Sequence, residues 1–356
     1  MPDESVNLAL SSSSSSSSES EDEFDPDLKP LLPYVPGYHF TAKQHDAEGP
    51  FGNKYQNECP PEIQGWKRLS QTQYCLRHAF PGGTTYNDVT LSSKIISRVR
   101  TGYDCGAQLV VVKAKLEGQT PVKLVAKIYD PMYYEGVEWK FKLDVVRYAI
   151  ADYTCEVAAY TELKKPSEGA KYTPAYHGSY VMDVEIPEEY RQDGIPSKRE
   201  VRLILIEYIH GVTMSHLDPI RLSKRQRNNI LIKAFIAEAT VTHAGVWQHD
   251  FSPRNIIVIG KDFDSEDLQV KLVDFSMATV DRLTGFDEEP PKLLLNPITR
   301  YWGVMMDFAV DGWVGDDENE PERWLWKHFH KDTRFVPVER NKKDMWAVPK
   351  MMIDEC

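Results

Sequence analysis

The sequence lacks the features that mark membrane-spanning, secreted and zinc-binding proteins. It contains no run of about 18 apolar residues, so no membrane span and no membrane partner are expected. Its first ten residues, MPDESVNLAL, are acidic, whereas a secretory signal begins with basic residues. The five cysteines are odd in number and form no CxxC pair, which argues against a disulfide framework and against a zinc site. These absences predict a protein of a reducing compartment, the cytoplasm or the nucleus.

Positive charge is also scarce. The chain has 42 Lys and Arg against 54 Asp and Glu, a formal net charge of −12. Residues 1–30 carry −7 of this charge, and the other 326 residues carry −5. A nearly neutral body lacks the broad basic face that binds nucleic acid, so no nucleic-acid partner is expected. Hydrophobic residues make up 41% and charged residues 27%, which is ordinary globular usage and excludes disorder of the whole chain.

The composition divides the first 90 residues into two parts. Ser11–Ser18 is an unbroken serine run, followed by ESEDEFDPD, so we expect residues 1–30 to form a disordered Ser-rich acidic tail. Two roles are open for it: a solubilising leader, or a regulatory tail phosphorylated at Ser18 and Ser20, each of which has Glu at the third following position. Residues 31–90 are rich in Pro, Gly and aromatic residues without a clear period, and we expect an irregular N-terminal extension there.

From residue 91 the pattern predicts an α+β fold. Short β-branched runs such as AQLVVVKAKL and VKLVAKIYD predict an antiparallel sheet. Residues 143–165 place apolar side chains at steps of three and four and predict an amphipathic helix. Further strands are expected at AYHGSYVMDVEI and VRLILIEYI, a long helix at 223–243, strands at NIIVIG and LQVKLVDF, and mainly helix beyond them.

One ordered set of charged and polar residues points to chemistry on phosphate. Asp250 and Asn255 lie five apart on a loop between a predicted helix and a predicted strand, and Asp274 follows the apolar run VKLV. Upstream, Lys127 lies in Val125-Ala126-Lys127 on a predicted strand, and Glu156 follows 29 residues later inside the predicted amphipathic helix. A triphosphate needs a fixed cation, and its magnesium ion needs hard oxygen ligands, so these residue types suit phosphoryl transfer.

In this order, the motifs resemble the protein kinase-like superfamily, and more narrowly the atypical fungal protein kinase-like proteins. The similarity to RIO-type and aminoglycoside-phosphotransferase-like kinases is more distant. The resemblance implies a bilobal kinase-like fold. Its N-lobe, residues 91–209, would hold an antiparallel sheet plus the αC helix, and its C-lobe, residues 210–356, would be reduced and mainly helical.

The resemblance also implies ATP and Mg²⁺ as cofactors and assigns a role to each residue of the set. Asp250 would act on the acceptor hydroxyl, Lys127 would bind phosphates, and Glu156 would anchor this lysine. Asn255 and Asp274 would hold magnesium. Nucleotide contacts would come from Gly102 and Gly106 over the phosphates and from the backbone of Glu207 and Ile209 at the adenine.

The sequence departs from the family in three places. It has no G-x-G-x-x-G motif, Gln248 and His249 replace the usual His-Arg, and Ser276 replaces the last Gly of Asp-Phe-Gly. The expected function is an atypical kinase-like phosphotransferase (EC 2.7) that transfers the γ-phosphate of ATP to a protein Ser/Thr hydroxyl. Two alternatives stay open: a catalytically weak pseudokinase or scaffold, and a small-molecule kinase accessory to a biosynthetic pathway. The sequence identifies neither the acceptor nor the oligomeric state.

Overall fold

The computed structural model describes residues 28–338 except 79, 104, 117, 119, 139–140, 192–193, 286–290 and 316–319. Nearly all of the predicted disordered tail, residues 1–30, therefore lies outside the described part of the chain. Leu28, Lys29 and Pro30 are the exception: the carbonyl oxygen of Leu28 accepts a hydrogen bond from Thr72, and Pro30 is buried.

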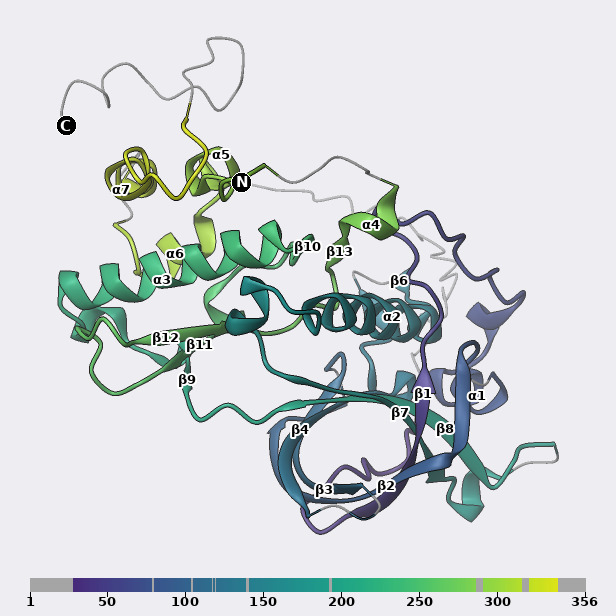
Figure 1. Ribbon diagram of the computed structural model, residues 1–356. Coiled ribbons are helices and arrows are strands. Elements are labelled where there is room, and N and C mark those ends of the chain that lie inside the picture. Colours follow the sequence, from purple (N-terminus) through teal and green to yellow (C-terminus); the bar gives the residue numbers. More distant parts are fainter. Residues whose placement is uncertain are drawn as a thin grey trace, which may run out of the picture.

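Six antiparallel strands close into a barrel, seen as a ring in Figure 1. Their order around the barrel is β1-β2-β3-β4-β8-β7. The strands are β1 (His39–Asp46), β2 (Thr84–Arg100), β3 (Gln108–Leu116), β4 (Val122–Tyr129), β7 (Tyr176–Glu185) and β8 (Lys198–Glu207). In the middle of β2, buried and exposed positions alternate, as expected of a strand with one face toward the barrel interior. Ile95 of β2 lies opposite Val112 of β3, and both are fully buried.

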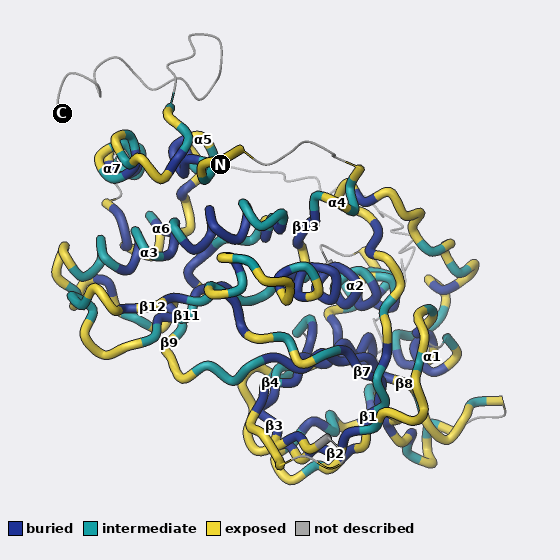
Figure 2. The backbone as a smooth tube through the Cα atoms, viewed as in Figure 1, coloured by how far each residue is buried: buried dark blue, intermediate teal, exposed yellow. Residues whose placement is uncertain are grey.

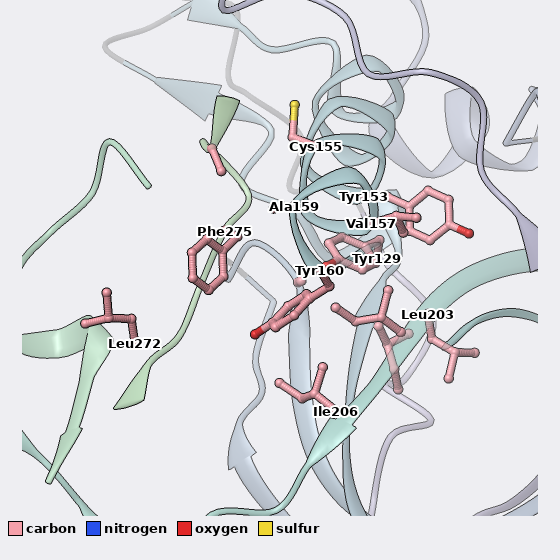
Figure 3. Packing of buried hydrophobic residues seen from close by; sticks show 14 of the residues in the cluster. Tyr129, Tyr153, Cys155, Val157, Ala159, Tyr160, Leu203, Ile206, Leu272 and Phe275 are labelled. Atoms are coloured by element: carbon pink, nitrogen blue, oxygen red, sulfur yellow. The ribbon is translucent and has the colours of Figure 1, made fainter. Parts of the chain in front are cut away.

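Helix α2 (Val145–Leu163) packs between the barrel and the segment that contains Phe275 (Figure 3). Asp144 caps its N-terminus by accepting a hydrogen bond from the backbone N–H of Arg147. The ring of Tyr160 meets that of Phe275 edge-on, with ring centroids 5.3 Å apart. Aromatic contacts of this geometry join α2 to the second half of the chain.

The second half of the chain combines small sheets with helices. Helix α3 (Lys224–His243) begins at the expected place, where Ser223 and Gln226 form a capping box. Strands β9 (Val212–Thr213), β11 (Ile256–Ile259) and β12 (Gln269–Leu272) form a three-stranded sheet, and β10 (Val246–Trp247) pairs with β13 (Thr279–Val280). The other helices of this half are α4 (Asp281–Thr284), α5 (Pro297–Tyr301), α6 (Met306–Val310) and α7 (Glu320–Phe329).

Several short elements complete the fold. Helix α1 (Gln71–Arg77) and the pair β5 (Val137–Glu138) and β6 (Phe141–Lys142) lie between barrel strands in the sequence. The 3-10 helices are η1 (Trp66–Arg68), η2 (Pro131–Tyr133), η3 (Glu168–Tyr172), η4 (Glu188–Tyr190), η5 (Met214–His216), η6 (Pro219–Arg221) and η7 (Pro253–Asn255). None of the helices within the described ranges is long and apolar enough to cross a bilayer.

A buried ion pair attaches the start of the described chain to the barrel. Asp130, which is fully buried, accepts two hydrogen bonds from the guanidinium of Arg199, at 2.5 and 2.6 Å. The hydroxyl of Tyr34 donates to the same carboxylate at 2.5 Å. Such a charge-assisted, two-pronged pair is among the stronger interactions that a protein interior holds.

The predicted bilobal kinase-like fold, with an antiparallel sheet and αC helix in one lobe and a reduced, mainly helical second lobe, is wrong. The strands form a closed six-stranded barrel, accompanied by small sheets and helices. The closing strand is β1, which pairs with both β2 and β7 and lies within residues 31–90, where an irregular extension was expected. The sequence of β1, HFTAKQHD, has few apolar residues and therefore gives only a weak local strand signal. The strand is instead fixed by its pairing with β2 and β7, which lie far from it in the chain. The boundary between residues 209 and 210 stays a prediction.

Candidate functional site

A buried lysine joins three separate parts of the chain. Lys127 of β4 is 4% exposed, and its Nζ lies 2.5 Å from Oε2 of Glu156 and 2.8 Å from Oδ1 of Asp274. Glu156 is fully buried in α2, where it also accepts hydrogen bonds from the Tyr129 hydroxyl (2.7 Å) and the Phe275 backbone N–H (3.3 Å). The barrel, α2 and the 274–276 segment therefore meet at one ionic cluster.

The two carboxylates determine the charge state of this lysine. Burial alone would lower the pKa of Lys127, but Asp274 and Glu156 outweigh it, and the pKa is raised above its ordinary value. Burial would raise the pKa of Asp274, yet the ammonium of Lys127 holds this pKa well below the usual range. The ammonium and the Asp274 carboxylate are thus both charged at neutral pH.

The 248–255 loop places Asp250 and Asn255 against each other. The Asn255 side-chain amide donates to Oδ2 of Asp250 at 2.8 Å and to its backbone oxygen at 3.0 Å. Arg254 donates to Oδ1 of the same carboxylate at 2.6 Å. Both carboxylate oxygens of Asp250 therefore accept hydrogen bonds from neighbours on its own loop.

Hydrogen bonds hold this loop beside the Asp274 segment. The Gln248 side chain donates to the backbone oxygens of Val273 (2.6 Å) and Asp274 (3.2 Å), and the Val273 backbone N–H donates to the backbone oxygen of Asn255 at 2.9 Å. The five predicted residues Lys127, Glu156, Asp250, Asn255 and Asp274 thus lie on segments that are in direct contact.

Backbone conformation marks the same two segments. Asp274 has φ 66° and His249 has φ 60°, values in the left-handed region that few non-glycine residues adopt. The imidazole of His249 is held by a hydrogen bond with the hydroxyl of Thr279 at 2.8 Å. A strained backbone conformation persists only where the surrounding structure holds it in place, and such conformations concentrate at functional sites.

Gly102 and Gly106 lie in the loop between β2 and β3, which a buried glutamine holds closed. The Gln108 side chain accepts from the Gly102 N–H at 2.8 Å and donates to the oxygens of Gly102 (2.9 Å) and Gly106 (3.4 Å). A Cβ added at Gly106 would lie 4.0 Å from Oδ2 of Asp152 on α2. This loop therefore lies beside the helix that carries Glu156, one turn before that residue.

Glu207 and Ile209, predicted to contact adenine, lie where the chain leaves β8. The Glu207 backbone N–H donates to the Ala175 oxygen at 2.9 Å, and its carboxylate pairs with Lys271 at 3.0 Å. Glu207 therefore links the barrel to the β9-β11-β12 sheet. Ile209 is half-buried, and its backbone forms no hydrogen bond with a described residue.

Sequence reasoning missed Asp152, which lies next to this cluster on α2. Burial raises the pKa of Asp152 to about 7. The charge of Lys127 opposes that shift, whereas the carboxylates of Asp274 and Glu156 add to it. The only signal in the sequence was its position four residues before Glu156, on the same face of the helix.

We expect Asp152→Asn to stabilise the protein at pH 8 more than at pH 5. A carboxylate whose pKa is raised in the folded state loses stability as pH rises from about 4 to about 7, and the amide removes this loss. At about 1.4 kcal/mol per pKa unit, the gain above pH 7 is roughly 2–4 kcal/mol. Urea unfolding at the two pH values measures it, with exposed Asp183→Asn as the control. An equal effect of Asp152→Asn at both pH values would contradict the assignment.

A cavity of about 640 Å³ lies apart from these residues, beside the N-terminal turn of α2. Its walls combine the apolar side chains of Ile63 and Ile150 with the charged side chains of Arg77, Arg147 and Asp144. None of the predicted site residues lines it. The cavity and the Lys127 cluster are therefore separate features of the same helix.

Comparison with known proteins adds no assignment. No protein-family model matches the chain, and no curated protein matches it. The chemical interpretation of the site therefore depends on its geometry.

Proposed function

We propose that this protein is an ATP- and magnesium-dependent phosphotransferase, as the resemblance of its motifs to the kinase-like superfamily implies. The observation that carries the proposal is the buried contact of Lys127 with Glu156 and Asp274, beside the loop that holds Asp250 and Asn255. A buried cation supplies the fixed positive charge that a triphosphate requires. Phosphoryl transfer then needs mainly positioning and charge stabilisation. The 248–255 loop and the Asp274 segment, which hydrogen bonds hold together, would provide this positioning.

The oxygen atoms of the site suit magnesium. Oδ2 of Asp274 and Oδ1 of Asn255 accept no hydrogen bond from a described residue, so both are available as ligands. Among the described residues, no three His, Cys, Asp or Glu side chains form a metal-binding group. Magnesium needs no such group, because it is held by one or two carboxylates together with water and substrate phosphates. When bound, the ion would neutralise phosphate charge.

Each residue then has a definite task in the proposed reaction. Lys127 binds the α- and β-phosphates, and Glu156 holds its ammonium in place. Asp250 lies on the joined loop, where it orients the incoming hydroxyl and accepts its proton. The Gly102–Gly106 loop covers the phosphates, and the backbone at Glu207 and Ile209 meets the adenine.

Nucleotide binding is the first test of this proposal. With ATP and magnesium at 100 times the dissociation constant, the expected stabilisation is about 2.7 kcal/mol, visible as a rise in the melting temperature. Asp274→Asn is expected to remove the magnesium-dependent part of the rise. The control, Asp267→Asn, changes an exposed carboxylate two residues before β12 and should leave the rise intact. No rise in the unmodified protein would refute the proposal.

A nucleotide-binding protein without turnover, a pseudokinase or scaffold, is the second candidate. It is favoured by the hydrogen bonds that Arg254 and Asn255 make to the two carboxylate oxygens of Asp250, because both oxygens are already engaged. This candidate would also bind ATP with magnesium, and it differs from the phosphotransferase only in that it would not transfer the γ-phosphate.

The acceptor is proposed to be a Ser/Thr hydroxyl of a protein, with a small-molecule hydroxyl as the alternative. Neither a nucleic acid nor a membrane enters the proposal. We also infer a cytoplasmic or nuclear location, in keeping with Cys59, Cys105 and Cys155, which form no disulfide with a described residue.

A further inference from the structure

The pairing register gathers four lysines on the outer face of the barrel. Lys94 of β2 lies directly opposite Lys113 of β3, which lies directly opposite Lys123 of β4. Lys115 is two residues beyond Lys113 and therefore points to the same face. All four are exposed, and Figure 2 shows the exposed outer side of β2 and β3. We refer to Lys94, Lys113, Lys115 and Lys123 as the lysine patch.

The charge of this patch is not neutralised within the described part of the chain. No lysine of the patch forms an ion pair with a described residue, and Lys123 instead lies over the ring of Tyr208, 3.6 Å from its centroid. His39 of β1 lies opposite Lys94 and extends the row without adding an acid. Like charges directly opposite on neighbouring strands are destabilising by roughly 0.2–1 kcal/mol per pair. The patch therefore favours an anionic partner.

The same chain carries the opposite charge in residues 1–27, which we call the acidic segment. It contains eight acids and no Lys, Arg or His, and six of the nine residues 19–27 are acidic. The segment ends where the described chain begins, at Leu28. Lys29 donates to the backbone oxygen of Tyr103, and the Leu32 backbone N–H donates to the Tyr103 hydroxyl at 3.3 Å, in the loop that joins β2 to β3. The described chain thus begins beside the loop that joins the two strands carrying three of the four lysines.

We propose that the lysine patch is the docking surface of the acidic segment of the same chain. Lys94 is six residues from Arg100 at the end of β2, a distance of about 20 Å at 3.3 Å per residue. The nine residues 19–27 can span up to about 30 Å when extended, so they reach the patch from Leu28. The attraction is electrostatic, and phosphorylation of Ser18 or Ser20 would strengthen it. This inference depends on the opposite charges of the patch and the segment and on the extended length of residues 19–27, and not on the proposed function.

Lysine labelling of the full-length protein tests the proposal. An amine-reactive ester is applied to the unmodified chain and to a variant in which Glu19, Glu21, Asp22, Glu23, Asp25 and Asp27 become their amides. Labelling rates of single lysines are read by peptide mass spectrometry. We expect the patch lysines to react faster in the amide variant, with no change at the exposed lysines Lys164, Lys261 and Lys331. Raising the salt from 0.1 to 1 M shortens the Debye length from about 10 to about 3 Å and should speed labelling of the patch in the unmodified chain only.

A carbodiimide reaction, which joins carboxylates to amines, then identifies the partner. In a mixture of isotopically light and heavy protein, crosslinks from residues 19–27 to the patch should connect peptides of one isotope only. Equal labelling rates in the two proteins would overturn the proposal. So would crosslinks that are spread over all exposed lysines or that join light to heavy chains, because the segment would then act non-specifically or between copies.

Discussion

Replacing Arg199 with methionine is expected to lower the free energy of unfolding by about 3–5 kcal/mol, because the change leaves the Asp130 carboxylate buried without its cation. Asp130 is fully buried, and both of its oxygens accept hydrogen bonds from the Arg199 guanidinium. The hydroxyl of Tyr34 cannot supply the missing positive charge. Urea unfolding followed by circular dichroism measures the loss.

The neighbouring residue on β8 is a matched control for this change. Lys198 pairs with Glu185 at 2.9 Å, but its side chain is 52% exposed and that of Glu185 is 64% exposed. Exposed pairs contribute about 0–1 kcal/mol, so Lys198→Met should have a small effect. A loss for Arg199→Met no larger than that for Lys198→Met would show that the Asp130 pair does not stabilise the barrel. The double variant Asp130→Asn, Arg199→Met should recover part of the loss.

Asp250→Asn is expected to lower the rate of phosphoryl transfer by about 10²–10⁴-fold, the usual contribution of a general base. The amide keeps the shape of the side chain but cannot accept the proton of the acceptor hydroxyl. Binding of ATP with magnesium should be nearly unchanged, since Asp250 is not among the proposed phosphate or metal contacts. The transfer of labelled γ-phosphate to a general protein substrate and to a metabolite extract measures the rate.

The carboxylate of Asp307 provides the control for the charge around Arg254. It lies 3.8 Å from the Arg254 guanidinium and is 58% exposed, so Asp307→Asn should leave the rate within a few-fold of its original value. No transfer by the unmodified protein, with nucleotide binding intact, would favour the pseudokinase or scaffold. Label in the small-molecule fraction alone would reject the protein acceptor. A rate that is insensitive to Asp250→Asn would remove this residue from the proposed mechanism.

Most residues of the candidate site could be named from the sequence, but the contacts between them could not. Lys127, Glu156 and Asp274 are separated by up to 147 positions and lie on a strand, a helix and a loop, yet the structure brings both carboxylates within 2.8 Å of the Lys127 ammonium. Asp152 was missed because its raised pKa comes from burial and from charges supplied by other segments. Gln248 was read as a departure from the family pattern, yet its amide joins the two loops of the site.

Local patterns in the sequence by themselves determined strands β3, β4, β7, β8, β11 and β12, helices α2 and α3, and the presence of charged residues suited to phosphate chemistry. Periodicity and capping residues act over a few positions, so a single segment contains that information. Only the tertiary structure decided the closed barrel and the lysine patch. Ala42 of β1 lies opposite Leu91 on one side and Met182 on the other, and Lys113 lies opposite Lys94 and Lys123. Such registers follow from the packing of the whole sheet, because strand pairing joins residues that no local pattern connects.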